Sequence, residues 1–470
     1  GLFDVYLSPW FSAIYLLLFA SLIGCVTPRT KHHYKALRSQ PPRTPVRLSR
    51  LDDYEERTVP AADPASQARE AVDVAERQLR RAGYRVHRYD GRGWLSVSAE
   101  RGYLRETGNL VFHTALIGVL VSVGLGGGFS YTGQRVVVEG TTFVNALSDY
   151  SSFDAGRFID GTGLAPYSLT LDEFQVTYQR PGTPGAGQAG DFSADVTVRI
   201  PGEEDRTESV IVNYPISVAG DRIHLLGNGY APTITVRDAA GELVYTESQP
   251  FLPQDSNMTS LGIIKIPDGL PEQVGLVGFF YPTAGVLDSG AYTSIYGDVV
   301  NPLLTFNVYS GDLGIDDGTP RSVYTLETDG LTQHTGGQTG VDSIELTPGE
   351  TAELPNGWGT VTWEIASPED PVKRFASLQI QRDPTAGWVL AFSILAMLGL
   401  FAGLFVPRRR VWVKAHPTDE GVRLEYAGLA RGEDPTLRKA VVDIADTHTE
   451  ALTGVSDPSP EKERTDELPR

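Results

Sequence analysis

The chain has 470 residues, of which 41% are hydrophobic and 21% charged, and its net charge is −19. Its mean hydropathy is −0.16. These averages exclude a collagen-like chain, a disulfide scaffold and a fully disordered protein. They conceal three stretches without Asp, Glu, Lys or Arg, at residues 9–26, 110–125 and 387–406. A helix needs about 20 apolar residues to cross a bilayer, so we predict three transmembrane spans.

The charge is unevenly divided between the segments that separate these spans. Residues 126–386 hold 12 basic and 34 acidic residues, a net charge of −22. Residues 27–108 hold 17 basic and 11 acidic residues, and the tail 407–470 opens with three arginines within its first four residues. Lys and Arg near span ends are retained in the cytoplasm. We therefore expect the 27–108 loop and the tail inside a cell membrane, and the acidic segment outside.

This topology bears on the start of the chain. Three spans with a cytoplasmic C-terminus place Gly1 outside, yet no signal-peptide pattern precedes residue 9 and the sequence does not begin with Met. We therefore expect that a further span belongs before the first residue.

The cytoplasmic segments are predicted to be small α+β elements. Asp63 and Pro64 are typical of a helix start, apolar residues then recur at helical spacing, and Gly83 is typical of a helix end. A hairpin is predicted around the Asp90–Gly91 turn. In the tail, residues 411–413 and 422–426 predict a second hairpin, and residues 435–452 predict a helix. Residues 27–50 are interpreted as a solvated basic linker near anionic lipid rather than a nucleic-acid site. The charged end from Ser456 is expected to be disordered.

The acidic segment is predicted to be an all-β domain. Its apolar runs are rich in β-branched and aromatic residues and are separated by Gly, Pro, Asn and Asp. About 260 residues of this kind suggest one or two antiparallel sandwiches. Residues 181–190 are expected to form a mobile hairpin loop. The predicted strands are 174–178, 192–200, 209–214, 233–236, 274–281, 303–309 and 361–365.

Catalytic and metal motifs are scarce. The single cysteine, Cys25, lies in the first predicted span, so there is no CxxC motif for redox chemistry or zinc. His224 and His334 are more than a hundred residues apart, which disfavours a shared metal. The acidic turn at 312–318 lacks the spacing of a calcium loop, and the glycine-rich 124–128 lacks the Lys of a phosphate loop. We predict no catalytic residue and no metal site, and interpret 124–128 as a flexible exit from the membrane.

His113 is the one candidate site residue. It lies about one turn inside the second predicted span, at the cytoplasmic end. An ionisable side chain in a span usually faces a partner, a cavity or a ligand, and neutral imidazole is a good ligand for haem iron. A histidine at this depth can equally form a hydrogen bond to a neighbouring helix or to water.

The chain resembles the ResB family, also called CcsB, of the system II pathway of cytochrome c maturation. The resemblance runs along essentially the whole chain and rests on the order of several motifs. They are Ser8-Pro9-Trp10-Phe11, Ser21-Leu22-Ile23-Gly24-Cys25, Glu100-Arg101-Gly102 before Gly108, Phe112-His113, Leu171-Asp172-Glu173-Phe174, Val212-Asn213-Tyr214-Pro215-Ile216 and Arg408-Arg409-Arg410-Val411-Trp412-Val413.

The resemblance implies a function and partners. ResB-like proteins work with a membrane protein of the ResC or CcsA type to move haem across the membrane and join it to apocytochrome c, as a cytochrome c synthase complex. In the family, a histidine in the span before the outer domain is implicated in holding haem, and His113 matches it. The resemblance therefore implies haem b bound transiently and shared with the partner. The other predicted spans lack histidine, so the partner would supply the second ligand.

A second interpretation remains open. The chain would then be a membrane-anchored scaffold whose β domain binds an apoprotein or another assembly factor without contacting haem. In either case the sequence offers no nucleophile or base for covalent attachment, so whether the chain is itself an enzyme stays open. Its acidic outer domain would attract a basic partner such as apocytochrome c.

Overall fold

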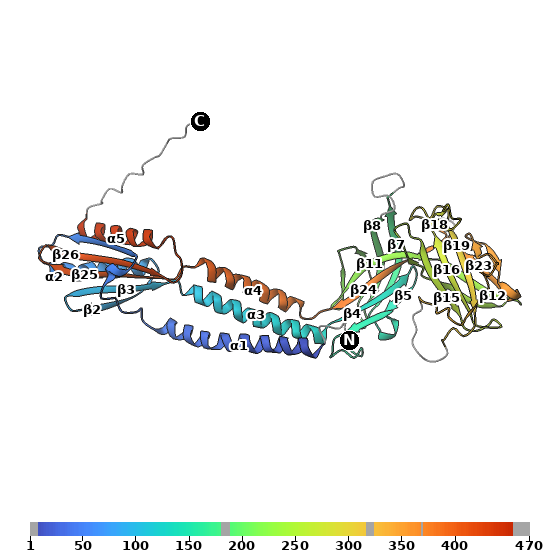
Figure 1. Cartoon of the computed structure of the whole chain (residues 1–470), viewed down its shortest axis with the longest axis horizontal. Coiled ribbons are helices and arrows are strands. Elements are labelled where there is room, and N and C mark those ends of the chain that lie inside the picture. Colours follow the sequence, from blue (N-terminus) through green and yellow to red (C-terminus); the bar gives the residue numbers. More distant parts are fainter. Residues whose placement is uncertain (1–7, 180–188, 316–323, 368–369, 455–470) are drawn as a thin grey trace, which may run out of the picture. The chain divides into compact units, whose positions relative to one another are not determined.

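The computed structural model describes residues 8–179, 189–315, 324–367 and 370–454. It divides into two compact units, residues 1–124 with 385–470 and residues 125–384. Figure 1 shows the helices in the first unit and most of the strands in the second. The predicted loop at 181–190 and the charged end from Ser456 fall largely outside the described residues.

Three helices of the first unit are long and apolar enough to cross a membrane, as predicted. They are α1 (Pro9–Arg38), α3 (Leu104–Phe129) and α4 (Ala386–Phe405). Glycines allow α3 and α4 to approach closely. A Cβ on Gly108 would lie 2.7 Å from the Gly399 carbonyl oxygen, and one on Gly399 would lie 2.6 Å from the Phe112 nitrogen. Small residues serve this purpose in spanning helices, where backbone contact replaces hydrophobic burial.

Two predictions about the ends of these helices are wrong. The 27–50 segment is not a plain solvated linker, because α1 continues to Arg38 and Leu48 is fully buried. Its Lys, Ala and Arg residues are good helix formers, so loss of apolar character at residue 27 does not end the helix. Residues 124–128 are not a flexible exit, because they form the last turns of α3. Glycine is unfavourable in a helix by about 1 kcal/mol but does not prevent one.

The polar part of the first unit is one α+β domain rather than separate segments. Its antiparallel sheet has the order β1-β26-β25-β3-β2, so strands of the 27–108 loop pair with strands of the tail. Helices α2 and α5 cover one face. The elements are β1 (Asp53–Val59), α2 (Pro64–Arg81), β2 (Arg85–Gly91), β3 (Trp94–Arg101), β25 (Arg409–Thr418), β26 (Gly421–Ala430) and α5 (Leu437–Thr453).

The predicted helix after Asp63 is confirmed as α2. The Asp63 carboxylate accepts hydrogen bonds from the backbone nitrogens of Ala65 and Ser66, both at 3.2 Å, which caps the helix. Its apolar stripe faces the sheet, and the buried residues are Ala68, Ala71, Val72, Ala75 and Leu79. Both predicted hairpins are also present, as β2–β3 and β25–β26.

On the opposite face of the sheet, the chain between α1 and β1 lies across β3 and β25. It includes a short 3₁₀ turn at Leu48–Arg50, which packs Leu48 against Trp412. Thr44 is hydrogen bonded to Ser96 at 2.7 Å, and Lys414 donates to the Val46 carbonyl at 2.9 Å. This segment therefore fixes the end of α1 to the sheet.

The described residues of the second unit are β-rich and form two large hydrophobic cores and a small cluster around Phe375, so the two-sandwich prediction fits better than a single sandwich. The first core lies between two antiparallel sheets. One is β10 (Ile216–Val218), β11 (Asp221–Ala231), β24 (Lys373–Arg382), β4 (Tyr131–Val138) and β6 (Ser152–Ala155). The other is β5 (Thr142–Val144), β7 (Ser168–Tyr178), β8 (Ala189–Arg199) and β9 (Arg206–Ile211).

The second core is built around Phe306 and Trp363, which are fully buried. One of its sheets is β13 (Leu243–Ser248), β12 (Thr233–Asp238), β23 (Gly359–Glu364) and β22 (Thr351–Glu353). The other is β14 (Leu252–Pro253), β15 (Ser260–Ile266), β16 (Val274–Tyr281), β19 (Leu303–Ser310) and β20 (Thr332–Gln333), with β21 (Ile344–Leu346) on β19. A small hairpin joins β17 (Ala284–Val286) and β18 (Tyr292–Ser294).

Strands pair directly outside both ends of α3 and α4. At one end, β3 runs into α3 and pairs with β25, which follows α4, with Arg101 opposite Arg409. At the other end, β4 follows α3 and pairs with β24, which precedes α4, with Tyr131 opposite Arg382. Figure 1 shows β24, from late in the chain, between β4 and β11.

Candidate functional site

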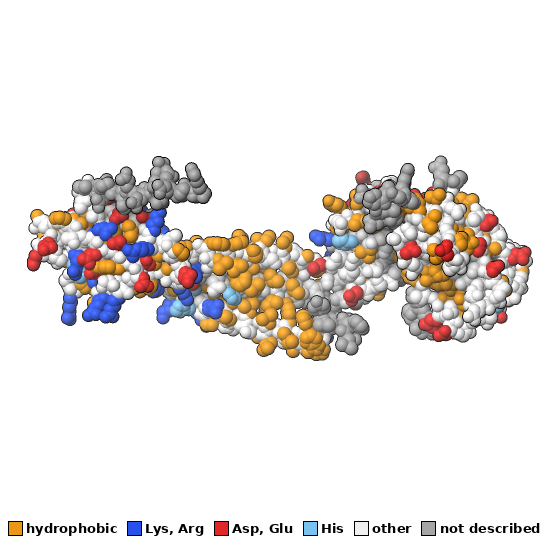
Figure 2. Space-filling view, turned by 45° about the horizontal axis from the view of Figure 1, so that its top comes forward, with side chains coloured by type: hydrophobic (Ala, Val, Ile, Leu, Met, Phe, Trp, Pro, Cys, Tyr) orange, Lys and Arg blue, Asp and Glu red, His pale blue; other side chains and the backbone are white. Residues whose placement is uncertain are grey.

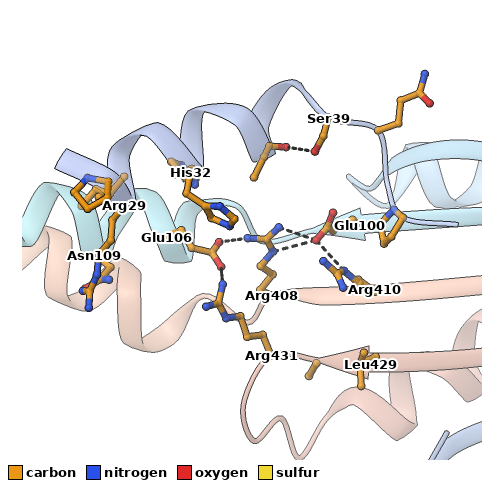
Figure 3. Close-up of a pocket in the computed structure, with 17 residues that line it drawn as sticks. Arg29, His32, Ser39, Glu100, Glu106, Asn109, Arg408, Arg410, Leu429 and Arg431 are labelled. Carbon is orange, nitrogen blue, oxygen red and sulfur yellow. Dashed lines mark hydrogen bonds and ion pairs between the residues drawn. The ribbon is translucent and has the colours of Figure 1, made fainter. Parts of the chain in front are cut away.

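A cavity of about 920 Å³ lies in the first unit where the apolar helices meet the α+β domain. The last turns of α1, the first turns of α3 and the adjoining ends of β3, β25 and β26 form its walls. Most of its charged side chains belong to one ion-pair network, drawn in Figure 3. Its charged and histidine residues are Arg29, His32, His33, Glu100, Glu106, Arg408, Arg410 and Arg431.

Arg408 is the centre of this network. It donates from Nε at 3.1 Å and Nη2 at 2.7 Å to Glu100 Oε1, and its Nη1 lies 2.5 Å from Glu106 Oε2. Arg410 donates to the same Glu100 oxygen at 3.1 Å, and Arg431 donates to Glu106 Oε1 at 2.8 Å. Figure 3 shows Arg408 between the two carboxylates. Buried ion pairs of this kind offset their desolvation only when every partner is present.

Burial and hydrogen bonding act in opposite directions on Glu100, which is 3% exposed. Burial alone would raise its pKa, but hydrogen bonds from Tyr103 and Arg408, with the charges of Arg408 and Arg410, hold the pKa below its ordinary value. Burial, together with the hydrogen bond to Glu100 and its charge, raises the pKa of Tyr103 to about 12. Glu100 is therefore ionised and Tyr103 neutral at physiological pH.

The local sequence explains why these groups meet. Gly102 ends β3 with a φ of 90°, and a Cβ there would lie 2.1 Å from the Pro407 carbonyl oxygen. Only glycine permits this close turn between β3 and α3. The arginines after α4 open β25, and the register sets Arg410 opposite Glu100. Arg409 faces the other way and donates to Asp434 at 2.5 and 2.9 Å. The arginine run thus binds carboxylates of its own domain.

His113, the residue predicted from the sequence, lies on α3 two turns beyond Glu106. Its Nδ1 is 2.7 Å from the carbonyl oxygen of Asn109, and its ring packs edge-on against Phe112. A carbonyl oxygen only accepts, so Nδ1 carries the proton and Nε2 keeps its lone pair. The side chain is partly exposed. One neutral imidazole with a free Nε2 fits one axial position of a haem iron.

Comparison with known proteins shows which family this chain belongs to. A sequence model of the ResB-like family matches residues 1–442. The chain belongs to the ResB-like family.

Among curated proteins, this ResB-like chain is similar to several named cytochrome c biogenesis protein CcsB. The protein from Gloeobacter violaceus is 29% identical over 221 residues, which are 47% of this chain and 42% of the relative. The one from Synechococcus sp. strain WH7803 is 25% identical over 266 residues, 56% of this chain and 55% of the relative. The chain spans about half the length of the curated relatives it matches.

Two further histidines of this ResB-like chain lie near the site. The extension of α1 carries His32 and His33, so the helix that continues the first predicted span does contain histidine. His33 is buried, and its Nε2 lies 3.0 Å from Thr107 Oγ1 on α3. Thr107 precedes His113 by six residues, or about 9 Å along the helix axis. Sequence analysis missed both histidines because they follow the apolar stretch, although the helical character of 29–38 could have indicated them.

The other candidates do not assemble into a site. His224 is in β11, whereas His334 follows β20 and lies 2.8 Å from Ser310 Oγ, packed against Trp358. Asp312 closes a turn by accepting from the Gly314 nitrogen, and residues 316–318 lie outside the described part. Cys25 is a free thiol on α1. Within the described residues, no group of three His, Cys, Asp or Glu side chains could hold a metal ion.

Proposed function

We propose that this chain functions in cytochrome c biogenesis as the haem-handling subunit of a membrane complex. Membership of the ResB-like family and the names of its relatives support a role in cytochrome c biogenesis. The observation that carries the haem assignment is the tautomer of His113, because the bond to Asn109 orients the ring and leaves Nε2 able to bind iron. Haem is the cargo of this site, and its iron takes the imidazole as a ligand.

The proposal includes an arrangement in the membrane. Helices α1, α3 and α4 cross the membrane, the α+β domain lies in the cytoplasm and the β-rich unit lies outside. The net charge of −22 over residues 126–386, against basic flanks on the other side, supports this orientation. Asp and Glu side chains are spread over the face of the β-rich unit seen in Figure 2, where a basic apocytochrome c could dock.

A ResC- or CcsA-type membrane protein is the proposed partner. His113 supplies one ligand, and the partner supplies the second. Covalent attachment of haem belongs to the complex, since no described side chain near His113 forms a nucleophile–base pair. This chain holds haem and presents it, with apocytochrome c, for that reaction.

Spectroscopy of the full chain purified with the partner tests the haem assignment. Wild-type protein should carry a haem Soret absorbance, and His113→Ala should lower it severalfold because one axial ligand is lost. Added imidazole should restore it by occupying the vacated position. Thr114→Ala, an exposed neighbour on the same helix, is the matched control. An unchanged spectrum in His113→Ala would remove the ligand assignment.

A scaffold without haem contact is the second candidate. It is favoured by the β-rich unit, which has two hydrophobic cores of its own and a strongly acidic composition. In that case the full chain with His113→Ala would still capture apocytochrome c, and neither variant nor wild type would carry haem. Capture lost together with haem would instead support the haem-handling function.

A further inference from the structure

The cavity beside the Arg408 network has two kinds of wall. Its apolar lining comes from both sides, with Pro28 and Ala36 of α1 and Leu110 of α3 on the helices and Pro42, Leu429 and Ala430 on the domain. Its polar part comes from the network and from Arg29. Residues 9–26 and 110–125 carry no charge, so the cavity lies where both apolar stretches end and charged sequence begins. A polar ligand that fills the cavity can therefore extend an apolar part along these uncharged stretches.

The cavity also has an excess of positive charge. Its lining contains four arginines and two glutamates. Glu100 and Glu106 are already neutralised by Arg408, Arg410 and Arg431, so that cluster alone retains one positive charge. Arg29 adds a second, and no hydrogen bond or ion pair holds its guanidinium within the described residues. A walled site with fixed cations attracts an anion.

His33 contributes an unpaired buried nitrogen to the same cavity. Thr107 Oγ1 donates its only proton to the Tyr103 carbonyl at 3.1 Å, so it must accept from His33 Nε2. The proton of a neutral His33 is therefore on Nε2, and Nδ1 is buried with no hydrogen-bond partner among the described residues. His33 is 8% exposed and lines the cavity. Burial lowers the pKa of His33, so the neutral form is favoured and Nδ1 would accept a hydrogen bond from a ligand hydroxyl.

We propose that this cavity binds an anionic phospholipid, whose phosphate is held by Arg29 beside the Arg408 network and whose headgroup hydroxyl donates to His33 Nδ1. A phosphodiester carries a single negative charge and several acceptor oxygens, and it joins this polar group to acyl chains that lie along α1 and α3. At about 920 Å³ the cavity is at the upper end of the roughly 300–1,000 Å³ typical of small-molecule sites, so it accommodates a headgroup with its glycerol. The bound lipid would fix the α+β domain at the membrane surface.

Native mass spectrometry of the full chain tests this proposal. The haem-free protein is exchanged into micelles containing phosphatidylglycerol or phosphatidylcholine, and the lipid retained per chain is measured. Wild type should retain phosphatidylglycerol in preference. Arg29→Gln should lower its apparent affinity roughly tenfold, the effect of losing one charge-assisted hydrogen bond. His33→Gln should lower it as well.

Lys31→Gln is the matched control, since Lys31 is exposed on the same helix but does not line the cavity. Equal losses in Arg29→Gln and Lys31→Gln would overturn the proposal in favour of diffuse surface attraction. Displacement of phosphatidylglycerol by millimolar inorganic phosphate would overturn the lipid as the source. Circular dichroism checks that each variant folds. The result is independent of haem binding, so this proposal and the proposed function can fail separately.

Discussion

Each unit contains a buried carboxylate at the strands that continue into α3 and α4, but the two carboxylates are stabilised differently. Glu100 is surrounded by Arg408, Arg410 and the hydroxyl of Tyr103. Asp221 in the β-rich unit is fully buried and accepts mainly from neutral donors. These are Tyr131 at 2.6 Å, Tyr167 at 3.0 Å and Asn145 at 3.2 Å, with Arg382 at 3.2 Å as the one cation.

The comparison shows two solutions to one structural problem. In each unit these strands are paired along a backbone ladder, and the buried carboxylate adds side-chain hydrogen bonds there. Near the cytoplasmic face in the proposed topology, arginines supply the donors, because such residues also orient the spans. In the acidic β-rich unit, tyrosines supply them, and burial with the nearby Asp221 raises the pKa of Tyr131 and Tyr167. The stability that Glu100 contributes should depend on charge, and the stability that Asp221 contributes should depend on hydrogen-bond geometry.

Removal of Glu100 should have the largest effect. Glu100→Ala removes the buried carboxylate that Arg408 and Arg410 share. We expect the free energy of unfolding to fall by about 3–5 kcal/mol. Thermal unfolding of the full chain in detergent, followed by protease sensitivity of the α+β domain, measures the loss. Glu70→Ala, an exposed carboxylate on α2, is the control and should have little effect. Equal melting temperatures for Glu100→Ala and Glu70→Ala would show that the network is dispensable for stability.

Acid should weaken the α+β domain specifically. His448 in α5 is buried, donates from Nε2 to the Ala71 carbonyl and accepts from the Tyr426 hydroxyl. Burial lowers its pKa from 6.5 to about 4. Unfolded His448 takes up a proton near pH 6.5 and the folded form does not, so stability is full above pH 6.5 and falls towards pH 4. The loss is about 3 kcal/mol at its limit.

The β-rich unit should respond to acid in the opposite sense at one site. Burial raises the pKa of Glu139, so its folded form binds a proton more readily and acidification favours folding there. Hydrogen exchange of the full chain between pH 7 and pH 5 separates the two responses. Exchange in α2 and α5 should rise relative to the intrinsic rate, and His448→Gln should reduce that pH dependence. Equal pH dependence of the variant and wild type would exclude His448 as the cause.

Asp221→Asn should have a smaller effect than Glu100→Ala. The substitution retains the shape and one acceptor oxygen, but it weakens the bonds from the tyrosines and removes the partner of Arg382. We expect a loss of about 1–3 kcal/mol. Hydrogen exchange at β4 and β24 measures it, with Asp238→Asn at a surface turn as the control. A loss as large as that of Glu100→Ala would mean that charge also dominates in the β-rich unit.

The surface charge of the β-rich unit should affect binding rather than stability. If it attracts a basic apocytochrome c, the association rate should fall roughly tenfold or more as ionic strength rises from 0.01 to 0.15 M. A neutral peptide carrying the same haem-binding motif is the control and should show little dependence on salt. An association rate for apocytochrome c that does not change with salt would exclude electrostatic attraction.

Local patterns predicted much of this fold, whereas contacts across the chain were not accessible from one sequence. The buried stripe of α2 follows from periodicity, and the seven predicted strands of the β-rich unit correspond to β7, β8, β9, β12, β16, β19 and β23, which are a minority of the strands described there. The strand β1 was missed because Asp53–Val59 is mostly polar and pairs with β26, more than 360 residues away. Strand β11 was missed because Gly227 and Gly229 interrupt its pattern.

The candidate site was predicted only in part, for the same reason. His113 could be found because a histidine within an apolar stretch is unusual. The network of Arg408 with Glu100 and Glu106 joins the tail to residues about 300 positions earlier, so only the fold shows that these charges meet. His33 was hidden because helix α1 continues beyond the apolar residues that predict a span.

The most direct test of the central claim is cytochrome c formation in cells that carry this chain and the proposed ResC- or CcsA-type partner as the sole maturation system. Covalently bound haem on a reporter cytochrome c is measured by haem staining. The account predicts that His113→Gly abolishes most of this haem, that added imidazole restores it, and that Thr114→Ala is neutral. Full maturation by His113→Gly without imidazole would contradict it.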